Sequence, residues 1–301
     1  MYGRPSIIVR VLLLTGATGL IGTALLRKLL AAGRPVRCLV RDPRRLGGER
    51  VRVQIALGDL SDPPSFRNAL RGVDTVVHLA AAIRDQPGGS IEELNAIATW
   101  RMVHAARRAG VGHFVFFSAQ SASAHSRARF MRAKALAERA VAESGVPHTI
   151  FAPSLVYAPG DMFLTLLERM SLLPVMPISG SGRALFEPIW AQDVADCVMA
   201  ALERSDAGAR YELSGPQTLS YDEIVRLVLD ALQRSRPLVH VPLAIVSRSL
   251  RSLEAIARTK AFATWDEAEL MEISMTALRG KYDANLLGVA PRSMRDVLAV
   301  V

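Results

Sequence analysis

The chain has 301 residues, of which 50% are hydrophobic and 22% are charged, so it can bury a sizeable core in one large domain or in a core with a smaller lobe. The net charge of +9 does not indicate nucleic-acid binding, because only four of the 37 basic residues are lysines and no basic patch is interleaved with aromatic residues. No apolar run approaches the length of a membrane span, and two cysteines give no disulfide framework. We therefore expect no nucleic-acid partner, and we expect Cys38 and Cys197 to be buried thiols.

Apolar runs alternate with helical periodicity along the first half of the chain. Strands are predicted at 7–14, 36–40, 51–57, 75–79, 113–117 and 149–152, and helices at 20–32, 64–70, 91–109 and 129–143. This alternation predicts an α/β fold, namely a Rossmann-type doubly wound parallel sheet with helices on both faces. After residue 153 prolines interrupt the pattern, and helices resume at 191–203 and 221–233. We therefore divide the chain into a core at 1–155 and a smaller C-terminal lobe at 156–301, partly interleaved with the core.

The most informative segment is T-G-A-T-G-L-I-G at 15–22, between the first predicted strand and the first predicted helix. Gly16 permits a tight turn, Gly19 lets a ligand approach the backbone, and Gly22 lets the helix pack closely on the strand. The helix that follows presents free N–H groups and a partial positive charge at its start. A glycine-rich turn between this strand and this helix therefore predicts a site for a dinucleotide pyrophosphate, with substrate between the sheet and the C-terminal lobe.

Further motifs follow in a fixed order. They are G-D-L at 58–60, V-V-H-L-A-A at 76–81, F-V-F-F-S at 114–118, Lys134 on a predicted helix, and P-S-L-V-Y at 153–157. Together with the glycine turn, this set resembles the short-chain dehydrogenase/reductase superfamily. The extended and atypical branches are most similar, especially the NAD(P)-binding proteins like the mitochondrial complex I accessory subunit and the NmrA-like group. The resemblance is strong to about residue 160 and continues loosely at 190–196 and 286–294.

The resemblance implies further cofactor contacts. It assigns Asp59 and Leu60 to the adenine, with the carboxylate facing the adenine amino group, and the small residues Ala80 and Ala81 to the ribose. It also assigns cofactor contacts to Thr18, Leu20 and Ile21 in the glycine turn, to Pro153, and to Lys134, which would bind the nicotinamide ribose. Lys134 remains open to a second interpretation as a surface lysine, and His78 is predicted to be a core histidine rather than a ligand. No spacing among the six histidines indicates a metal site.

The end of the second predicted strand bears on the choice of cofactor. Arg41 lies 25 residues after Gly16, near the position where an acid recognises the 2′-hydroxyl of NAD or an arginine accommodates the 2′-phosphate of NADP. A guanidinium can bind a phosphate through two parallel hydrogen bonds, so the sequence favours NADP over NAD. Two alternatives stay open: a solvated arginine-rich loop, and a ribose contact from Asp42.

The expected catalytic pair is incomplete. Catalytic members of the superfamily carry Tyr-x-x-x-Lys on one helix, which places both side chains on one face. Here Phe130 precedes Lys134 by four residues, and phenylalanine cannot exchange a proton. The candidate catalytic residues are therefore Lys134 and Ser118, while Gln120 stands where the usual serine is expected. Tyr157 is expected to be structural, although it is also a possible substitute acid.

Two functions remain open on these grounds. In the first, the protein is an NADPH-dependent reductase of a small apolar carbonyl or enone; in the second, it binds NADPH without turnover as a structural, assembly or redox-sensing protein. An epimerase or dehydratase activity is disfavoured because that chemistry depends on the missing tyrosine.

Location and partners are less constrained. The start of the chain passes directly into the first predicted strand, so no cleaved signal peptide is expected and the cytoplasm is the expected compartment. Membrane association is not expected, although the segment 242–257, with Arg248 and Arg251 among apolar residues, could lie on a membrane or a partner instead of forming a half-buried helix. The substrate, the oligomeric state and any protein partner stay open.

Overall fold

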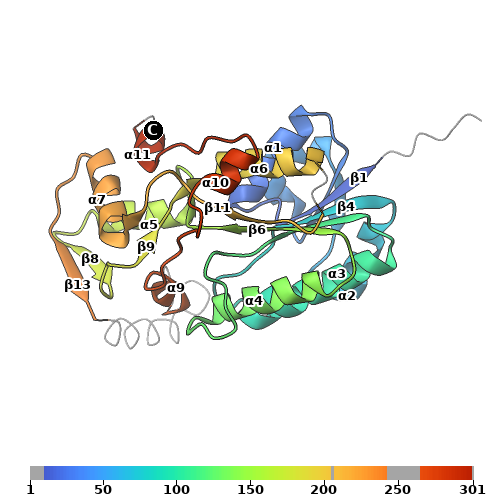
Figure 1. The fold of residues 1–301 in the computed structure, drawn as a ribbon, viewed down its shortest axis with the longest axis horizontal. Coiled ribbons are helices and arrows are strands. Elements are labelled where there is room, and N and C mark those ends of the chain that lie inside the picture. The colour runs from blue at the N-terminus through green and yellow to red at the C-terminus, as the bar shows by residue number, and fades with distance from the viewer. Residues whose placement is uncertain (1–9, 205–206, 243–264, 300–301) are drawn as a thin grey trace, which may run out of the picture.

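A seven-stranded parallel sheet forms the centre of the molecule (Figure 1). The computed structural model describes residues 10–204, 207–242 and 265–299. The strand order is β11-β6-β5-β4-β1-β2-β3, and every neighbouring pair is parallel. The strands are β1 (Val11–Thr15), β2 (Val36–Val40), β3 (Gln54–Leu57), β4 (Val73–His78), β5 (His113–Phe117), β6 (His148–Pro153) and β11 (Arg210–Leu213). The order reverses between β1 and β4, as in a doubly wound fold, so the predicted fold class is confirmed.

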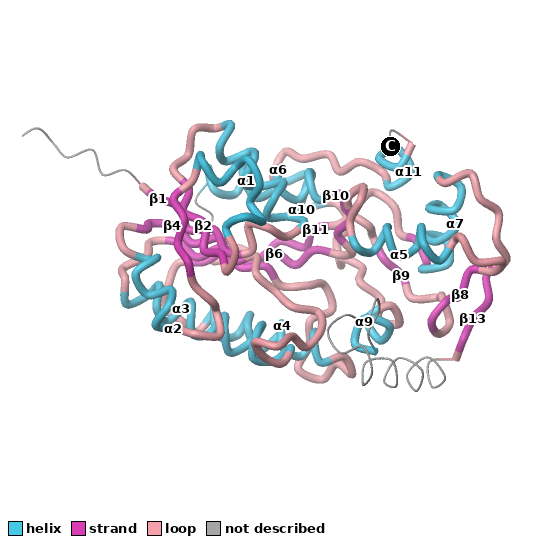
Figure 2. Tube along the Cα trace, turned by 180° about the vertical axis from the view of Figure 1, so that it is seen from behind, coloured by secondary structure: helices cyan, strands magenta, loops and turns pink. Residues whose placement is uncertain are grey.

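Helices cover both faces of the sheet, as Figures 1 and 2 show. α1 (Leu20–Ala31) and α6 (Ala191–Arg204) lie on one face, and α2 (Pro63–Phe66), α3 (Ala98–Arg108) and α4 (Arg129–Ala142) on the other. β1 is buried along its whole length because both of its faces are covered, which explains its continuous apolar sequence.

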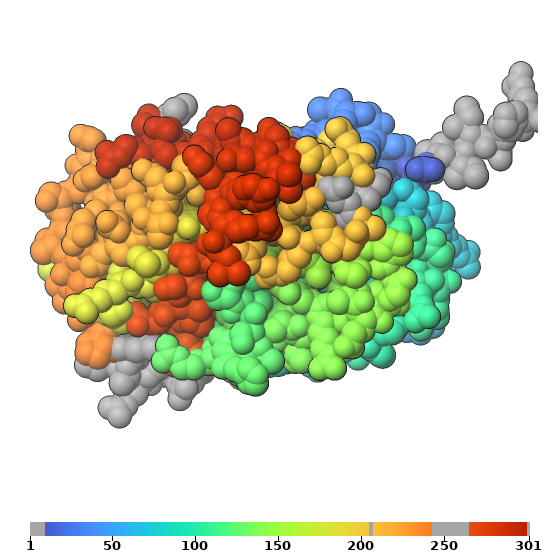
Figure 3. All heavy atoms as spheres, viewed as in Figure 1, coloured from blue at the N-terminus to red at the C-terminus, as the bar shows by residue number. Residues whose placement is uncertain are grey.

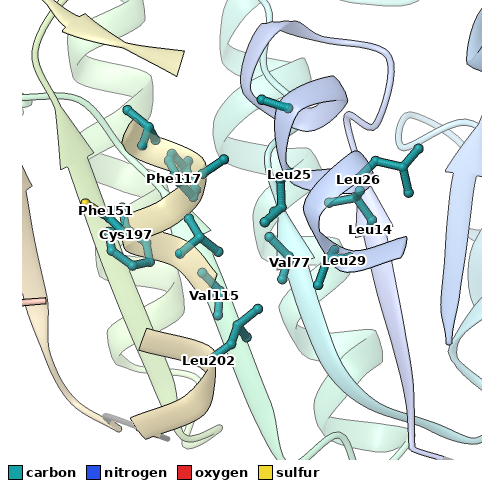
Figure 4. Packing of buried hydrophobic residues seen from close by; sticks show 14 of the residues in the cluster. Leu14, Leu25, Leu26, Leu29, Val77, Val115, Phe117, Phe151, Cys197 and Leu202 are labelled. Carbon is teal, nitrogen blue, oxygen red and sulfur yellow. The ribbon is translucent and has the colours of Figure 1, made fainter. Parts of the chain in front are cut away.

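The core under α1 and α6 is one continuous apolar cluster. Figure 4 shows Leu25 and Leu29 of α1 beside Val77 of β4, and Cys197 of α6 beside Phe151 of β6. Both cysteines are buried free thiols, as predicted, and burial raises the pKa of each thiol to about 12. Residues far apart in the sequence therefore share this layer of the core.

One predicted boundary is wrong. Residues 51 and 52 end a 3₁₀ segment, η1 (Pro43–Arg52), so β3 occupies only the second part of the strand predicted at 51–57. Val51 is 82% exposed, which means that its apolar side chain contributes nothing to the sheet. The helix predicted at 91–109 is confirmed over residues 91–108, and it contains a π-helical turn, η3 (Glu93–Ile97), before α3 begins.

The second half of the chain contributes to two different parts of the molecule. β11 and α6 join the central sheet layer, although no strand was predicted at β11. The rest of this half forms short strand pairs and helices around a separate apolar cluster that includes Tyr157, Phe186 and Ile224. The strand pairs are β7 (Val156–Tyr157) with β10 (Ile189–Trp190), β9 (Leu185–Phe186) with β12 (Leu219–Ser220), and β8 (Met176–Ser179) with β13 (Leu238–Val241), and the helices are α5 (Met162–Met170), α7 (Tyr221–Ala231), α9 (Trp265–Leu270) and α11 (Met294–Leu298).

The last described residues return toward the sheet. α10 (Tyr282–Leu286) packs near β11, and Figure 3 shows this part of the chain, in red, crossing the middle of one face. Residues 7–9 of the first predicted strand and nearly all of the segment 242–257 lie outside the described residues. In the parts of the chain that are described, no helix combines the length and apolar character needed to cross a membrane.

The packing of α1 on the glycine turn gives a first test. A Cβ atom at Gly22 would overlap the carbonyl oxygen of Gly16, so Gly22→Ala must push α1 away from the turn. We expect a loss of about 1–3 kcal/mol of stability, seen as a fall of several degrees in Tm by calorimetry, together with loss of nucleotide binding. The matched control is Gly112→Ala, just before β5 at the amino end of the strands, where an added Cβ meets only an ordinary contact with Asp74. Equal Tm values for the two variants would contradict the close approach.

Candidate functional site

A cleft of about 500 Å³ opens at the carboxyl ends of β1, β2 and β4, where the strand order reverses. Ligands of doubly wound sheets bind at this position. The cleft is lined by eight of the residues that the sequence singled out, namely Gly16, Thr18, Gly19, Arg41, Asp59, Leu60, Ala80 and Ala81. The fold therefore gathers one group of predicted residues from four separate segments of the chain.

The glycine turn forms the floor of this cleft. Gly16 has a φ of +73°, and a Cβ atom there would lie 2.6 Å from the backbone nitrogen of Ala80. Gly19 precedes α1, and no side chain caps the helix start, so the first N–H groups of α1 remain available to an anion. Leu20 and Ile21 begin α1, and neither lines the cleft. The turn has the shape and the free donors that a pyrophosphate requires.

A guanidinium and a carboxylate, from Arg41 and Asp42, both line the cleft at the end of β2. The Arg41 side chain is 56% exposed, and its Nη1 lies 4.0 Å from Oδ2 of Asp59. Asp42 also lines the cleft, and its Oδ1 accepts a hydrogen bond of 2.9 Å from the backbone N–H of Arg44 and so caps η1. Arg45, three residues after Asp42 in the sequence, lines the cleft as well.

Asp59 is held in place by its own loop. Its Oδ1 accepts hydrogen bonds from the backbone N–H and the hydroxyl of Ser61, at 2.9 and 2.8 Å. The other carboxylate oxygen is the one near Arg41. This arrangement fixes the direction of the carboxylate and leaves Oδ2 at the cleft.

The wall of the cleft opposite Arg41 is the segment that leaves β4. Hydrogen bonds and ion pairs from side chains behind this segment hold it in place. Asn95, which is 1% exposed, donates to the carbonyl of Ala82 at 2.7 Å and accepts from its N–H at 3.2 Å. Arg129 donates to Glu92 at 2.7 Å and to Asp85 at 3.0 Å, and this pairing lowers the pKa of Glu92 to about 2. Sequence reasoning missed Asn95; the only signal was a polar residue inside an apolar helical pattern.

Lys134 is buried, so the interpretation as a surface lysine is wrong. It is 3% exposed, and Nζ donates a hydrogen bond of 2.6 Å to the carbonyl of Phe117. The amine lies over two aromatic rings, 5.1 Å from the centroid of Phe116 and 5.5 Å from that of Phe130. Burial lowers the pKa of Lys134 to about 7, while the charge of Glu138 opposes that effect. The amine therefore titrates near neutrality.

The other candidates for proton transfer lie near the ends of β5 and β6. Ser118 is buried, and its hydroxyl has no hydrogen-bond partner among the described residues. The amide nitrogen of Gln120 donates a hydrogen bond of 2.8 Å to the hydroxyl of Ser214, so Gln120 is not placed to act as an acid. Tyr157 is fully buried, and burial raises the pKa of its phenol above the usual value, which favours the structural interpretation. Pro153 ends β6, and its carbonyl accepts from the N–H of Gln120 at 3.0 Å.

Five predicted site residues do not line the cleft. They are Leu20, Ile21, Ser118, Lys134 and Pro153. His78 ends β4, bonds to Thr15 at 2.8 Å and to Thr99 at 3.1 Å, and is fully buried. Burial, aided by the charge of Lys134, lowers the pKa of His78 to about 3. The prediction of a satisfied core histidine is confirmed, and within the described residues no cluster of His, Cys, Asp or Glu could hold a metal ion.

A glycine turn and a free helix start at the switch point of a parallel sheet define a dinucleotide-binding protein. The chain belongs to the NAD dependent epimerase/dehydratase family, whose model matches residues 12–214. This membership confirms the predicted relation to the extended short-chain dehydrogenases/reductases and makes the fold an NAD(P)-binding one.

Similar proteins differ in what their names say they do. The chain is 30% identical over 236 residues to an NAD(P)H azoreductase of Xenophilus azovorans, covering 78% of this chain and 77% of that protein. It is 25% identical over 258 residues to the photosystem II assembly factor Ycf39 of Cyanophora paradoxa, covering 84% of this chain and 76% of that one. A nucleoside-diphosphate-sugar epimerase from Staphylococcus aureus has the same fold, with a TM-score of 0.75 at 21% identity over 96% of this chain and 99% of that chain.

The buried amine gives a pH-dependent test of stability. Because the pKa of Lys134 falls to about 7 on folding, the unfolded chain holds more protons than the folded protein above that pH, and the Lys134 contribution makes stability rise toward about pH 10. Below about pH 7 Lys134 is charged in both the folded and the unfolded state, so the folded protein bears the full free-energy cost of burying that charge. We expect Lys134→Met to remove a rise of about 1–4 kcal/mol, measured as the free energy of unfolding in urea at both ends of this range.

The comparison between proteins isolates this effect. Cys38 and Cys197, with pKa values raised to about 12, change stability with pH in the opposite direction, but they do so equally in wild type and variant. Lys281→Met, at an exposed lysine, is the matched control and should keep the wild-type pH dependence. If Lys134→Met also kept it, Lys134 would not be a buried titrating group.

Proposed function

We propose that this protein is an NADPH-dependent reductase of a small apolar carbonyl or enone. The observation that carries the proposal is a buried amine with a pKa near neutrality, Lys134, beside the phenylalanine that replaces the usual tyrosine. Such an amine can hold a proton and release it at physiological pH, which is what a general acid must do. The name of the azoreductase relative supports a reductive activity.

The choice of NADPH over NADH rests on charge at the end of β2. Arg41, Asp42 and Arg45 all line the cleft, and one oxygen of the Asp42 carboxylate is occupied in capping η1. A 2′-phosphate would meet two guanidinium groups against one carboxylate there, which favours NADPH. The nearby carboxylate of Asp59 remains for the adenine, which is the role that the resemblance gives it.

Lys134 and Ser118 would each contribute to the reduction of the substrate carbonyl. When bound, a reduced nicotinamide supplies a hydride to the substrate carbon. Lys134 lies outside the lining of the nucleotide cleft, so the substrate oxygen would have to reach it past the half-buried Phe130. There Lys134, as an ammonium, would donate its Nζ proton to that oxygen as negative charge develops on it, and the neutral amine would regain a proton from solvent by the same route. Ser118, with its unpartnered buried hydroxyl, would donate a hydrogen bond to the same oxygen.

Apolar side chains near Lys134 support the choice of substrate class. Phe130 is half-buried, and its ring leaves no hydrogen-bonding group where a tyrosine would place one. Phe116 contributes a second ring, whose centroid lies 5.1 Å from Nζ of Lys134. A substrate without many polar groups fits these neighbours best.

Phe130 also supports the second function, which is NADPH binding without turnover. The resemblance to an assembly factor points the same way. For either function we propose a cytoplasmic location, because both cysteines are unpaired buried thiols, and a small molecule rather than a nucleic acid as ligand.

Nucleotide preference tests the cofactor assignment. We expect wild type to bind NADPH more tightly than NADH, and we expect Arg41→Ala to weaken NADPH binding about 10- to 100-fold while changing NADH binding little. Fluorescence titration with both nucleotides measures this. Arg52→Ala, an exposed arginine on η1 outside the cleft lining, is the control and should bind both as wild type does. If neither nucleotide bound to wild type, the cofactor assignment would fail.

Turnover separates the two functions. Wild type, Phe130→Tyr and Lys134→Met are screened for NADPH oxidation with aldehydes, quinones and enones. The reductase proposal predicts activity in wild type that falls at least about 100-fold in Lys134→Met and follows a group with a pKa near 7. Activity in Phe130→Tyr alone would instead identify a site that has lost its acid, and would favour the second function.

A further inference from the structure

An exposed apolar turn follows α5. Leu172, Leu173, Pro174 and Val175 are four consecutive exposed residues, and their three larger side chains are 67%, 48% and 39% exposed for Leu172, Leu173 and Val175. Single exposed apolar residues are ordinary on protein surfaces, but an uninterrupted run of them marks an interaction site. We call these four residues the apolar tip.

The apolar tip is held rigidly by the segment that follows α7. Nε of Arg236 donates to the carbonyls of Ser171 and Leu173, at 3.1 and 2.9 Å. Nη1 of Arg234 donates to the hydroxyl of Ser171 at 2.6 Å. The backbone N–H of Leu173 is also paired, with the carbonyl of Met170 at 3.0 Å. The tip therefore keeps its shape without a partner, and its paired backbone is a poor template for an added strand.

Positive charge surrounds the base of the tip. Arg169, in the last turn of α5, is exposed, and none of Arg169, Arg234 and Arg236 forms an ion pair with any other described residue. The nearest acids in the sequence are Glu168 and Asp230, both exposed, so the local balance is positive. The whole chain carries a net charge of +9, which adds a general attraction to anionic surfaces.

We propose that the apolar tip docks this protein on the surface of an anionic phospholipid bilayer. The leucines and the valine enter the boundary between headgroups and acyl chains, while the three guanidinium groups lie at the level of the phosphates. The apolar tip, with arginines at its base, is complementary to this interface, which is apolar toward the acyl chains and anionic toward the headgroups. The proposal departs from the expectation drawn from the sequence, and it does not depend on the proposed enzymatic function.

Vesicle binding tests the proposal with the full-length protein. We expect wild type to sediment with phosphatidylserine-containing vesicles and to bind neutral phosphatidylcholine vesicles far more weakly, with binding that weakens as the salt rises from about 0.1 M to about 0.5 M. The double variant Leu172→Gln/Leu173→Gln, which changes no charge, should lower the partition coefficient at least about tenfold. Arg169→Gln should lower it several-fold and reduce the salt dependence.

The control is Leu278→Gln, at a 94% exposed leucine whose N–H bonds to Glu212 of the sheet layer, and it should bind vesicles as wild type does. Thermal melts and NADPH titration confirm that each variant is folded. Equal vesicle binding by wild type and the double variant would overturn the proposal. So would self-association of wild type without lipid that the double variant loses, because a second copy of the chain would then cover the tip.

Discussion

The close approach of α1 to the turn that precedes it is the constraint on which the nucleotide cleft depends. Gly22 leaves no room for a side chain above the carbonyl of Gly16, and Gly16 in turn lies against the backbone of Ala80. These contacts join β1, α1 and the chain leaving β4 at the point where the strand order reverses. The cleft and the free helix start lie at this junction, and Arg41 lines the same cleft from the end of β2.

The proposed chemistry of the bound nucleotide depends on a second group of contacts, around Lys134. The resemblance described this lysine as a ribose ligand, but the structure surrounds its amine with aromatic rings and a backbone carbonyl. Desolvation disfavours the charged form of Lys134. Because phenylalanine stands at position 130, the helix has no phenol to exchange a proton beside this lysine. The helix loses a phenol and retains an amine that can exchange protons at neutral pH.

The parts that sequence predicts well are those with local signals. The glycine turn, the buried strands and the arginine at the end of β2 can each be read from a few neighbouring residues. β11 could not be predicted, because R-Y-E-L is short and its parallel partner β6 lies about sixty residues away. The alternation at 51–53 predicted a strand that tertiary structure replaced with 3₁₀ turns. The burial of Lys134 could not be predicted from the sequence either, since a lysine on an amphipathic helix ordinarily faces solvent.

The protonation of Lys134 is the most direct test of this account. The chain has four lysines, so nitrogen-labelled lysine gives few NMR signals, and Lys134→Arg assigns the one of interest. Titration of the Nζ resonance should give a pKa of about 7 for Lys134 in the free protein. A pKa near the ordinary lysine value of about 10.4 would contradict the account, because the amine would then be a fixed cation and no proton donor at neutral pH.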